Sequence, residues 1–345
     1  MSAGSIVRFR PTGPWRFGPD SGSRDRIDVI YHSDSVFSAV TTTMQRLGAM
    51  EEWLDATARR GSEPEVRFSS FFPFQDDLLY VTPPRSIWPP APSPKIRYKG
   101  ARFVPLSVIQ GLLTDQPINE DRWTLDGESQ CLIPTGKEAR QGPFRVSVRS
   151  NAAVDRLSPA FVETHTTACI EFARDAGLWT AVIYSSDEAR ERWEARLRSV
   201  FRLLADSGFG GGRSLGWGRS EDPEWSSDDP LKVDLMPPKL ESPDEPSVPW
   251  PAAHWLLSVY APAESDGVDW KTGNYATIQR TGRTETSSNW GALKRETLMI
   301  SEGSVLVASN APCGEARDVS PANFPHPVYR AGYAVTIAIP WRGVL

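Results

Sequence analysis

The sequence has few cysteines and few histidines for its 345 residues. Its three cysteines, Cys131, Cys169 and Cys313, lie far apart and lack the paired spacing of thiolate metal sites. Neither a disulfide framework nor a zinc site is therefore expected, and a reducing cytoplasm fits this cysteine usage. The four histidines also show no metal-ligand spacing; they are His32, His165, His254 and His326. We predict no metal and no cofactor.

Long hydrophobic runs are absent as well. No stretch approaches the roughly 20 uninterrupted apolar residues that span a bilayer. Residues 1–6 lack the basic start and apolar core of a signal peptide. No membrane role is predicted, and we expect a cytoplasmic location.

The chain has no excess of positive charge, since its formal net charge is -5. This balance argues against a protein that coats nucleic acid indiscriminately, because such binding needs a broadly positive surface. The charges are segregated, however. Residues 271–295 carry five basic side chains and one acidic one, whereas residues 221–246 carry nine acidic side chains and two lysines. Any nucleic-acid site must therefore be local.

The apolar pattern of the first 220 residues predicts strands and two long helices. We expect one helix from about Ser33 to Gly61, and another from about Asp187 to Ser207, started by a Ser185–Glu188 capping box and ended by Gly208 in a left-handed cap. Strands are predicted at residues 5–10, 66–68, 145–149, 168–172 and 178–184 and around Trp217. The order strand, helix, paired strands, helix, strand is ferredoxin-like.

Prolines and acidic residues interrupt this pattern twice. The proline-rich residues 71–105 exclude a central strand or helix over most of their length, so we interpret them as a projecting insertion. The acidic, proline-rich residues 221–253 are interpreted as a linker. Residues 254–345 then show strand patterns and no long helix. We predict an α+β protein with two ferredoxin-like domains, residues 1–220 and 254–345, and long loop insertions.

The glycine-rich run at residues 208–218 is the most distinctive motif. Phosphate-binding loops of the P-loop and dinucleotide types place their glycines after a strand and before a helix. These glycines follow a predicted helix instead, and no Gly-Lys-Ser or Gly-Lys-Thr is present. A nucleotide-hydrolysing site is therefore not expected. The run offers a backbone that can approach a polymer closely, together with the cation of Arg213 and the ring of Trp217.

At this run the chain resembles the RAMP superfamily of CRISPR-associated RNA-binding proteins, whose members carry a glycine-rich loop after the second helix of a ferredoxin-like domain. Within it, the chain is similar to the fourth-subunit family of the type III-A effector, the Csm complex. The resemblance also rests on Tyr31-His32-Ser33-Asp34-Ser35-Val36-Phe37-Ser38-Ala39 and on residues 302–306 and 327–334. The proline-rich region matches no motif of the family.

The resemblance implies a non-catalytic subunit that binds the 5′ handle of the CRISPR guide RNA. It implies contacts with the large polymerase-cyclase subunit and with the backbone RAMP subunit, and only an indirect relation to target RNA. Candidate RNA-binding residues are His32, Ser33, Arg8, Arg10, Arg149, Arg156, Gly208, Phe209, Gly210, Gly211, Gly212, Arg213, Ser214, Trp217, Arg280, Arg283 and Arg295. Phe9, Trp15 and Trp217 are candidates for stacking on bases.

His32 leaves a second function open. In related RAMP proteins that process guide RNA precursors, a histidine acts as general acid or base when a 2′-hydroxyl attacks the chain. A metal-independent endoribonuclease with His32 as acid or base is therefore the alternative. His32 could equally contact RNA or bond at the helix start. A protein-binding scaffold without an RNA contact of its own is a third possibility.

Overall fold

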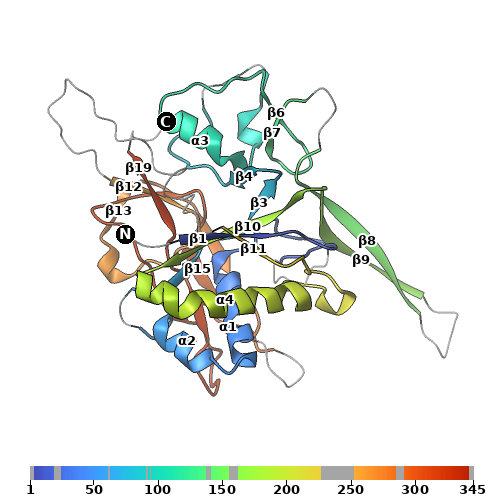
Figure 1. Ribbon diagram of the computed structural model, residues 1–345, viewed down its shortest axis with the longest axis vertical. Helices are drawn as coiled ribbons and strands as arrows, with labels where there is room; N and C mark the ends of the chain where they lie inside the picture. Colours follow the sequence, from blue (N-terminus) through green and yellow to red (C-terminus); the bar gives the residue numbers. More distant parts are fainter. Residues whose placement is uncertain are drawn as a thin grey trace.

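The computed structural model describes residues 4–18, 25–60, 63–90, 92–93, 95–136, 141–154, 162–226, 252–284 and 291–341 (Figure 1). Arg156 and residues 227–251, which make up most of the predicted linker, lie outside the described residues. Within the described part, no helix is long and apolar enough to cross a membrane.

A seven-stranded antiparallel sheet forms the centre of the N-terminal unit. Its strand order is β11-β1-β10-β3-β4-β5, and β2 also pairs with β10. The strands are β1 (Gly4–Phe9), β2 (Val66–Phe68), β3 (Phe72–Gln75), β4 (Leu78–Val81), β5 (Val104–Pro105), β10 (Ala176–Tyr184) and β11 (Glu224–Ser226). The strands predicted at residues 5–10, 66–68 and 178–184 are therefore confirmed.

Helices cover both faces of this sheet. The helices α1 (Ser33–Arg46), α2 (Met50–Ala56) and α4 (Asp187–Ser207) lie on one side, and α3 (Leu106–Leu113) lies on the other with the small hairpin of β6 (Trp123–Leu125) and β7 (Leu132–Pro134) (Figure 1). The α4 stripe buries Trp193, Leu197, Val200, Phe201 and Leu204, at the spacing of a single helix face. Taken in sequence, β1, α1, β2, β10, α4 and β11 follow the β-α-β-β-α-β order.

Two details of the predicted helices are wrong. The first helix is interrupted after α1, because Gly48 adopts a φ of 70° that helical residues do not use, and α2 starts at Met50. The N-cap of α4 is Ser186 rather than Ser185, and its side chain accepts a hydrogen bond from the Ala189 amide at 3.2 Å. Gly208 does end α4, with φ 76° but an extended ψ of 153°.

The proline-rich region does not begin as a projecting insertion. Its first residues form β3 and β4, and β3 pairs with the central strand β10. Pro73 lies opposite Leu178 of β10, and the pairing with β4 starts only at Phe74. The amide hydrogen that proline lacks is therefore not needed for the pairing with β4. Further along, Trp88, Tyr98 and Phe103 are buried. Most of this region therefore packs against the body of the protein.

The predicted strands at residues 145–149 and 168–172 are confirmed, but they lie outside the seven-stranded sheet. They belong to β8 (Phe144–Val154) and β9 (Val162–Phe172), which form a separate two-stranded sheet that projects away from the body (Figure 1). The strand expected around Trp217 is wrong. The sheet is completed by β11, which lies within the predicted linker and pairs with β1.

The C-terminal unit contains a four-stranded sheet in the order β13-β16-β12-β19 and two hairpins. Its strands are β12 (Ala252–Leu256), β13 (Val268–Asn274), β14 (Thr277–Arg280), β15 (Thr297–Ile300), β16 (Val305–Ala308), β17 (Ala316–Asp318), β18 (Tyr329–Ala331) and β19 (Thr336–Pro340). The description of this unit as a second ferredoxin-like domain stays a prediction.

The two units share one apolar core. Trp255, Val305 and Tyr333 of the C-terminal unit belong to the same buried cluster as the N-terminal strands and helices. Hydrogen bonds cross the boundary as well: the Tyr333 hydroxyl donates to the Thr57 carbonyl at 3.1 Å, and the Trp255 indole donates to the Thr82 carbonyl at 3.1 Å. Because the boundary is buried and bonded, the units hold each other in a fixed arrangement.

Candidate functional site

A cleft of about 700 Å³ lies where three parts of the chain meet. One part is α1 with the segment before it, the second is the glycine-rich loop, and the third is the segment around β14 and β18. Among the described residues, the lining holds seven arginine and lysine side chains and two carboxylates, which are Arg16, Arg46, Arg213, Arg280, Arg283, Lys294 and Arg330, and Asp28 and Asp34. A locally positive cleft has therefore formed on a chain of net negative charge.

The helix α1 presents a polar face to this cleft. Ser35, Ser38, Thr42 and Arg46 recur at three- and four-residue steps and line it, whereas Val36, Phe37, Val40 and Met44 are buried on the opposite face. The same amphipathic pattern that packs α1 against the core therefore also aims its small hydroxyl side chains at the cleft.

The glycine-rich loop follows α4 and folds tightly on itself. Gly208, Gly210, Gly212, Gly216 and Gly218 all have positive φ angles, between 76° and 82°. A Cβ atom at Gly208 would lie 2.5 Å from the Trp217 carbonyl oxygen, and one at Gly218 would lie 2.1 Å from the Phe209 carbonyl oxygen. Most of these glycines are therefore required by the loop's own backbone.

Only part of the loop borders the cleft. Phe209, Gly210, Gly211 and Arg213 line it. Gly211 differs from its neighbours, because its φ is not positive and a Cβ atom there would meet only the Arg16 side chain, at 3.2 Å. Arg213 is exposed. The loop thus offers the cleft one cation and a short stretch of backbone.

The aromatic residues proposed for stacking are buried instead. Phe9 and Trp15 have no exposed surface, Phe209 is 3% exposed and Trp217 is 9% exposed. The ring of Phe209 packs edge-on against Trp15 with a centroid distance of 4.7 Å. Phe9 and Trp15 lie inside an aromatic core, so the prediction that these two rings stack on bases is wrong, whereas stacking by Trp217 stays a prediction.

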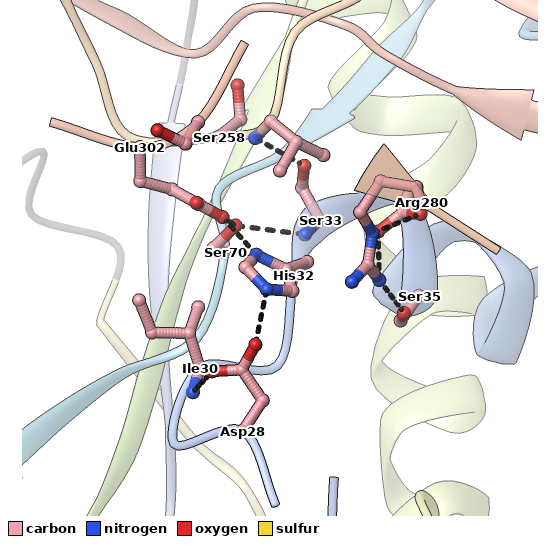
Figure 2. A network of polar contacts seen from close by, with 12 residues as sticks. Asp28, Ile30, His32, Ser33, Ser35, Ser70, Ser258, Arg280 and Glu302 are labelled. Carbon is pink, nitrogen blue, oxygen red and sulfur yellow. Dashed lines mark hydrogen bonds and ion pairs between the residues drawn. The ribbon is translucent and has the colours of Figure 1, made fainter. Parts of the chain in front are cut away.

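His32 lies at the start of α1 in a buried network of polar groups (Figure 2). Its Nδ1 lies 2.7 Å from Glu302 Oε1, and its Nε2 lies 2.9 Å from Asp28 Oδ2. The Ser70 hydroxyl donates to the same Glu302 oxygen and accepts the Ser33 amide at 2.9 Å. Both ring nitrogens of His32 are therefore engaged by carboxylates from different parts of the chain.

This arrangement keeps His32 charged. Burial alone would lower the pKa of His32, but the charge of the Glu302 carboxylate and the hydrogen bonds that His32 donates to both carboxylates raise this pKa to about 9. Burial would likewise raise the pKa of Glu302, yet the His32 imidazolium holds it below its usual value. An imidazolium that donates both protons to carboxylates has no lone pair with which to act as a general base.

Asp34, two residues after His32, forms a second buried cluster. Arg280 binds both of its carboxylate oxygens, at 3.1 and 2.9 Å, and also donates to the Ser35 hydroxyl at 3.0 Å. Arg330 also binds Asp34, at the Oδ2 oxygen that Arg280 Nε contacts. Burial alone would raise the pKa of Asp34, but the two guanidinium groups hold it well below its usual range. Asp34 thereby fixes two arginines of the C-terminal unit at the wall of the cleft.

Residues 252–339 match the family of the CRISPR Csm4 C-terminal domain. The whole chain has a similar fold to a chain in the crystal structure of the Csm3-Csm4 subcomplex of the type III-A CRISPR-Cas interference complex. The TM-score is 0.62 and the identity 16%, over 96% of this chain and 98% of that one. No curated protein matches the chain by sequence.

A second structure shows the same fold. A chain in the crystal structure of a Csm1-Csm4 cassette in complex with cA4 aligns with a TM-score of 0.55 and 16% identity, over 97% of both chains. The Csm4 C-terminal domain and the shared fold confirm the resemblance expected from the sequence. The two buried clusters link the segment that matches this domain family, through Glu302, Arg280 and Arg330, to α1 of the N-terminal unit.

Several predicted RNA contacts lie away from the cleft. Arg10 forms an ion pair with Glu224 at 2.7 Å, and Arg8 lies beside it over the Phe74 ring. Arg149 is exposed on the β8–β9 hairpin and pairs with Glu171, while Arg295 donates to the Asp318 carbonyl at 2.9 Å. None of these four arginines lines the cleft in the described part of the chain.

The other predicted residues either line the cleft or pack behind it. Ser33 is buried and its hydroxyl accepts the Val259 amide at 3.1 Å. Gly208, Gly212 and Ser214 belong to the loop but do not line the cleft. Arg280 and Arg283 do line it, Arg283 as an exposed side chain that donates to the Gly291 carbonyl at 3.0 Å.

Sequence reasoning missed four cationic residues of the cleft: Arg16, Arg46, Lys294 and Arg330. Arg46 had a visible signal, because it continues the four-residue spacing of polar residues along α1. Arg330 lies within one of the family-like stretches but is separated from Asp34 by 296 positions. Within the described residues, no group of three or more histidine, cysteine, aspartate or glutamate side chains is arranged to hold a metal ion.

Proposed function

We propose that the chain is a non-catalytic subunit of a type III-A CRISPR effector complex, and that its cleft holds the 5′ handle of the guide RNA. The observation that carries this proposal is the concentration of seven cations against two carboxylates in one cleft of an otherwise acidic chain. Phosphates of a single strand need such local cations, since binding releases their counterions.

The comparisons support the place of the chain in a complex. The similar structures are named as Csm3-Csm4 and Csm1-Csm4 assemblies. By analogy, this chain contacts both the backbone RAMP subunit and the large polymerase-cyclase subunit in the cytoplasm, and it meets target RNA only through the guide. The glycine-rich loop borders the cleft with Gly211 and Arg213, which suit a close approach of the RNA backbone.

The buried network argues against the endoribonuclease alternative. A histidine that cleaves RNA has to reach the 2′-hydroxyl or the leaving oxygen. His32 is 3% exposed, and both of its ring nitrogens are bonded to carboxylates. Its role in this proposal is to position α1 and the Csm4 domain at the cleft.

Reversing the charge of Arg46 tests the proposal. Arg46 is exposed at the end of α1 and lines the cleft, so Arg46→Glu should leave the fold intact. We expect the full chain to bind guide RNA at least about tenfold more weakly and with a shallower salt dependence, because a phosphate contact is lost and a repulsion is added. The measurement is a filter-binding titration at several salt concentrations.

The matched control is Arg174→Glu. Arg174 is 96% exposed in the turn before β10 and does not line the cleft in the described structure. Equal losses in the two variants would refute the cleft as the binding site. The same purified chain, incubated with precursor RNA, should yield no cleavage product, and a product that His32→Ala abolishes would restore the endoribonuclease alternative.

A further inference from the structure

Four hydroxyl side chains in the middle of α1 divide into two pairs. The Thr41 hydroxyl donates to the Phe37 carbonyl at 2.8 Å, and the Thr43 hydroxyl donates to the Ala39 carbonyl at 2.9 Å. Ser38 and Thr42 line the cleft and are half-buried, and within the described residues neither hydroxyl has a hydrogen-bond partner. The hydroxyls of Thr41 and Thr43 bond to the helix itself, although Thr43 also lines the cleft, and those of Ser38 and Thr42 are open to the cleft.

A buried arginine in the wall of the cleft also has an unsatisfied donor. Arg330 is 7% exposed and lines the cleft. One of its terminal nitrogens binds Asp34 and the other donates to the Thr281 carbonyl at 2.6 Å, but its Nε has no partner among the described residues. A buried donor without an acceptor costs about 1–3 kcal/mol, which marks Arg330 as an unsatisfied group in the wall of the cleft.

The two kinds of group suit different parts of a nucleotide. Cations bind phosphates, and most cations of the cleft come from the glycine-rich loop and from residues 280–330. Ser38 and Thr42 lie one helical turn apart, so their Cβ atoms are about 5–6 Å from each other. A hydroxyl can donate one hydrogen bond and accept others, and so can the ribose 2′-hydroxyl, which DNA lacks.

We infer that Ser38 and Thr42 bind ribose 2′-hydroxyl groups and thereby make the cleft select RNA over DNA. The inference rests on the proposed function, because it assigns these residues to a nucleic acid held in the same cleft. The cations supply affinity for any phosphate backbone, and the two hydroxyls supply the distinction between the sugars. Ser38 and Thr42 are therefore specificity-determining residues.

The test compares a Ser38→Ala/Thr42→Val double variant with the wild-type chain. Each full-length protein is titrated with a guide RNA carrying the 5′ handle and with the DNA of the same sequence. We expect the affinity for RNA to fall about five- to thirtyfold, as for the loss of two neutral hydrogen bonds, and the affinity for DNA to stay within about twofold. Single 2′-deoxy substitutions in the RNA should weaken binding to the wild type and have no effect on the double variant.

Two control variants remove hydroxyls that are already bonded to a helix carbonyl. Thr43→Val removes one on α1, and Ser199→Ala removes an exposed one on α4, where the hydroxyl donates to the Ala195 carbonyl at 3.1 Å. Neither should change the ratio of RNA to DNA affinity. An equal loss of RNA and DNA binding in the double variant, or an unchanged ratio, overturns the inference.

Failure of the inference differs from failure of the proposed function. If the wild-type chain binds RNA and Arg46→Glu abolishes this binding while the double variant keeps the full preference for RNA, the cleft binds RNA and the two hydroxyls do not select it. If the wild-type chain binds neither RNA nor DNA, the proposed function and the inference both fail.

Discussion

The glycine-rich loop and the start of α1 border the same cleft but are held in place by different physics. The loop is held by close backbone contacts and left-handed glycines, as at Gly212, where a Cβ atom would lie 2.7 Å from the Trp217 ring. The start of α1 is held by buried charges, with His32 between two carboxylates and Asp34 between two arginines. Sequence motifs mark both regions, yet few of the marked residues are exposed to the cleft.

This difference separates residues that build the cleft from residues that can contact a ligand. Glycines and buried ion pairs build it, and their substitution should affect folding first. The exposed cations and open hydroxyls, such as Arg46, Arg213 and Ser38, form its surface. A family motif therefore identifies the site without identifying the contacts.

The largest effect is expected at Asp34. Asp34→Ala would leave the half-buried Arg280 and the buried Arg330 without their shared carboxylate, which typically costs about 3–5 kcal/mol. The free energy of unfolding from urea titration measures this cost. As a control, Asp55→Ala removes an exposed carboxylate that pairs with Arg59 at 3.0 Å and should cost no more than about 1 kcal/mol. Similar costs in both variants would contradict the buried-charge account.

The next effect concerns pH. The pKa of His32 is raised to about 9 in the folded chain from about 6.5 in the unfolded one. Its stabilisation is therefore complete below about pH 6.5 and lost as the pH rises through about 9, which amounts to about 3 kcal/mol. Urea unfolding between about pH 6 and pH 9.5 should show this slope in the wild type and lose it in His32→Gln. Parallel curves for the two proteins would rule out a charged, doubly bonded His32.

A smaller effect distinguishes two adjacent glycines. Gly212→Ala places a side chain at φ 76° against the Trp217 ring and should cost about 2 kcal/mol. Gly211→Ala meets only the flexible Arg16 side chain and should change stability by no more than about 0.5 kcal/mol. Thermal unfolding compares the two. If Gly211→Ala destabilised the chain as much as Gly212→Ala, the loop would not be held in the way described.

Local patterns predicted much of the N-terminal unit and little of the site. The apolar stripe of α4 and the alternation of β1 are periodic in sequence, so both elements were predicted close to their observed bounds. Gly48 interrupts the first helix because a single positive φ outweighs the continuing apolar pattern. The pairing of His32 with Glu302 spans 270 positions, and no local pattern encodes such a contact.

The exposure of aromatic side chains was equally hard to foresee. Trp217 and Trp15 carry rings that can stack on bases, but tertiary packing buries both side chains. The hydroxyl side chains of α1 were missed for the opposite reason. Serine and threonine on a helix carry no local signal for binding, and only the fold shows that they line a cleft. Only the fold therefore shows which side chains line the cleft.

The most direct test of the central claim is to recover the tagged chain and its Arg46→Glu variant from the host and to sequence the small RNA that comes with each. The account predicts that the wild type carries many different guides with one shared 5′ leader, and that the variant carries markedly fewer of them. Recovery of no RNA with the wild type, or of RNAs without a common leader, would contradict it.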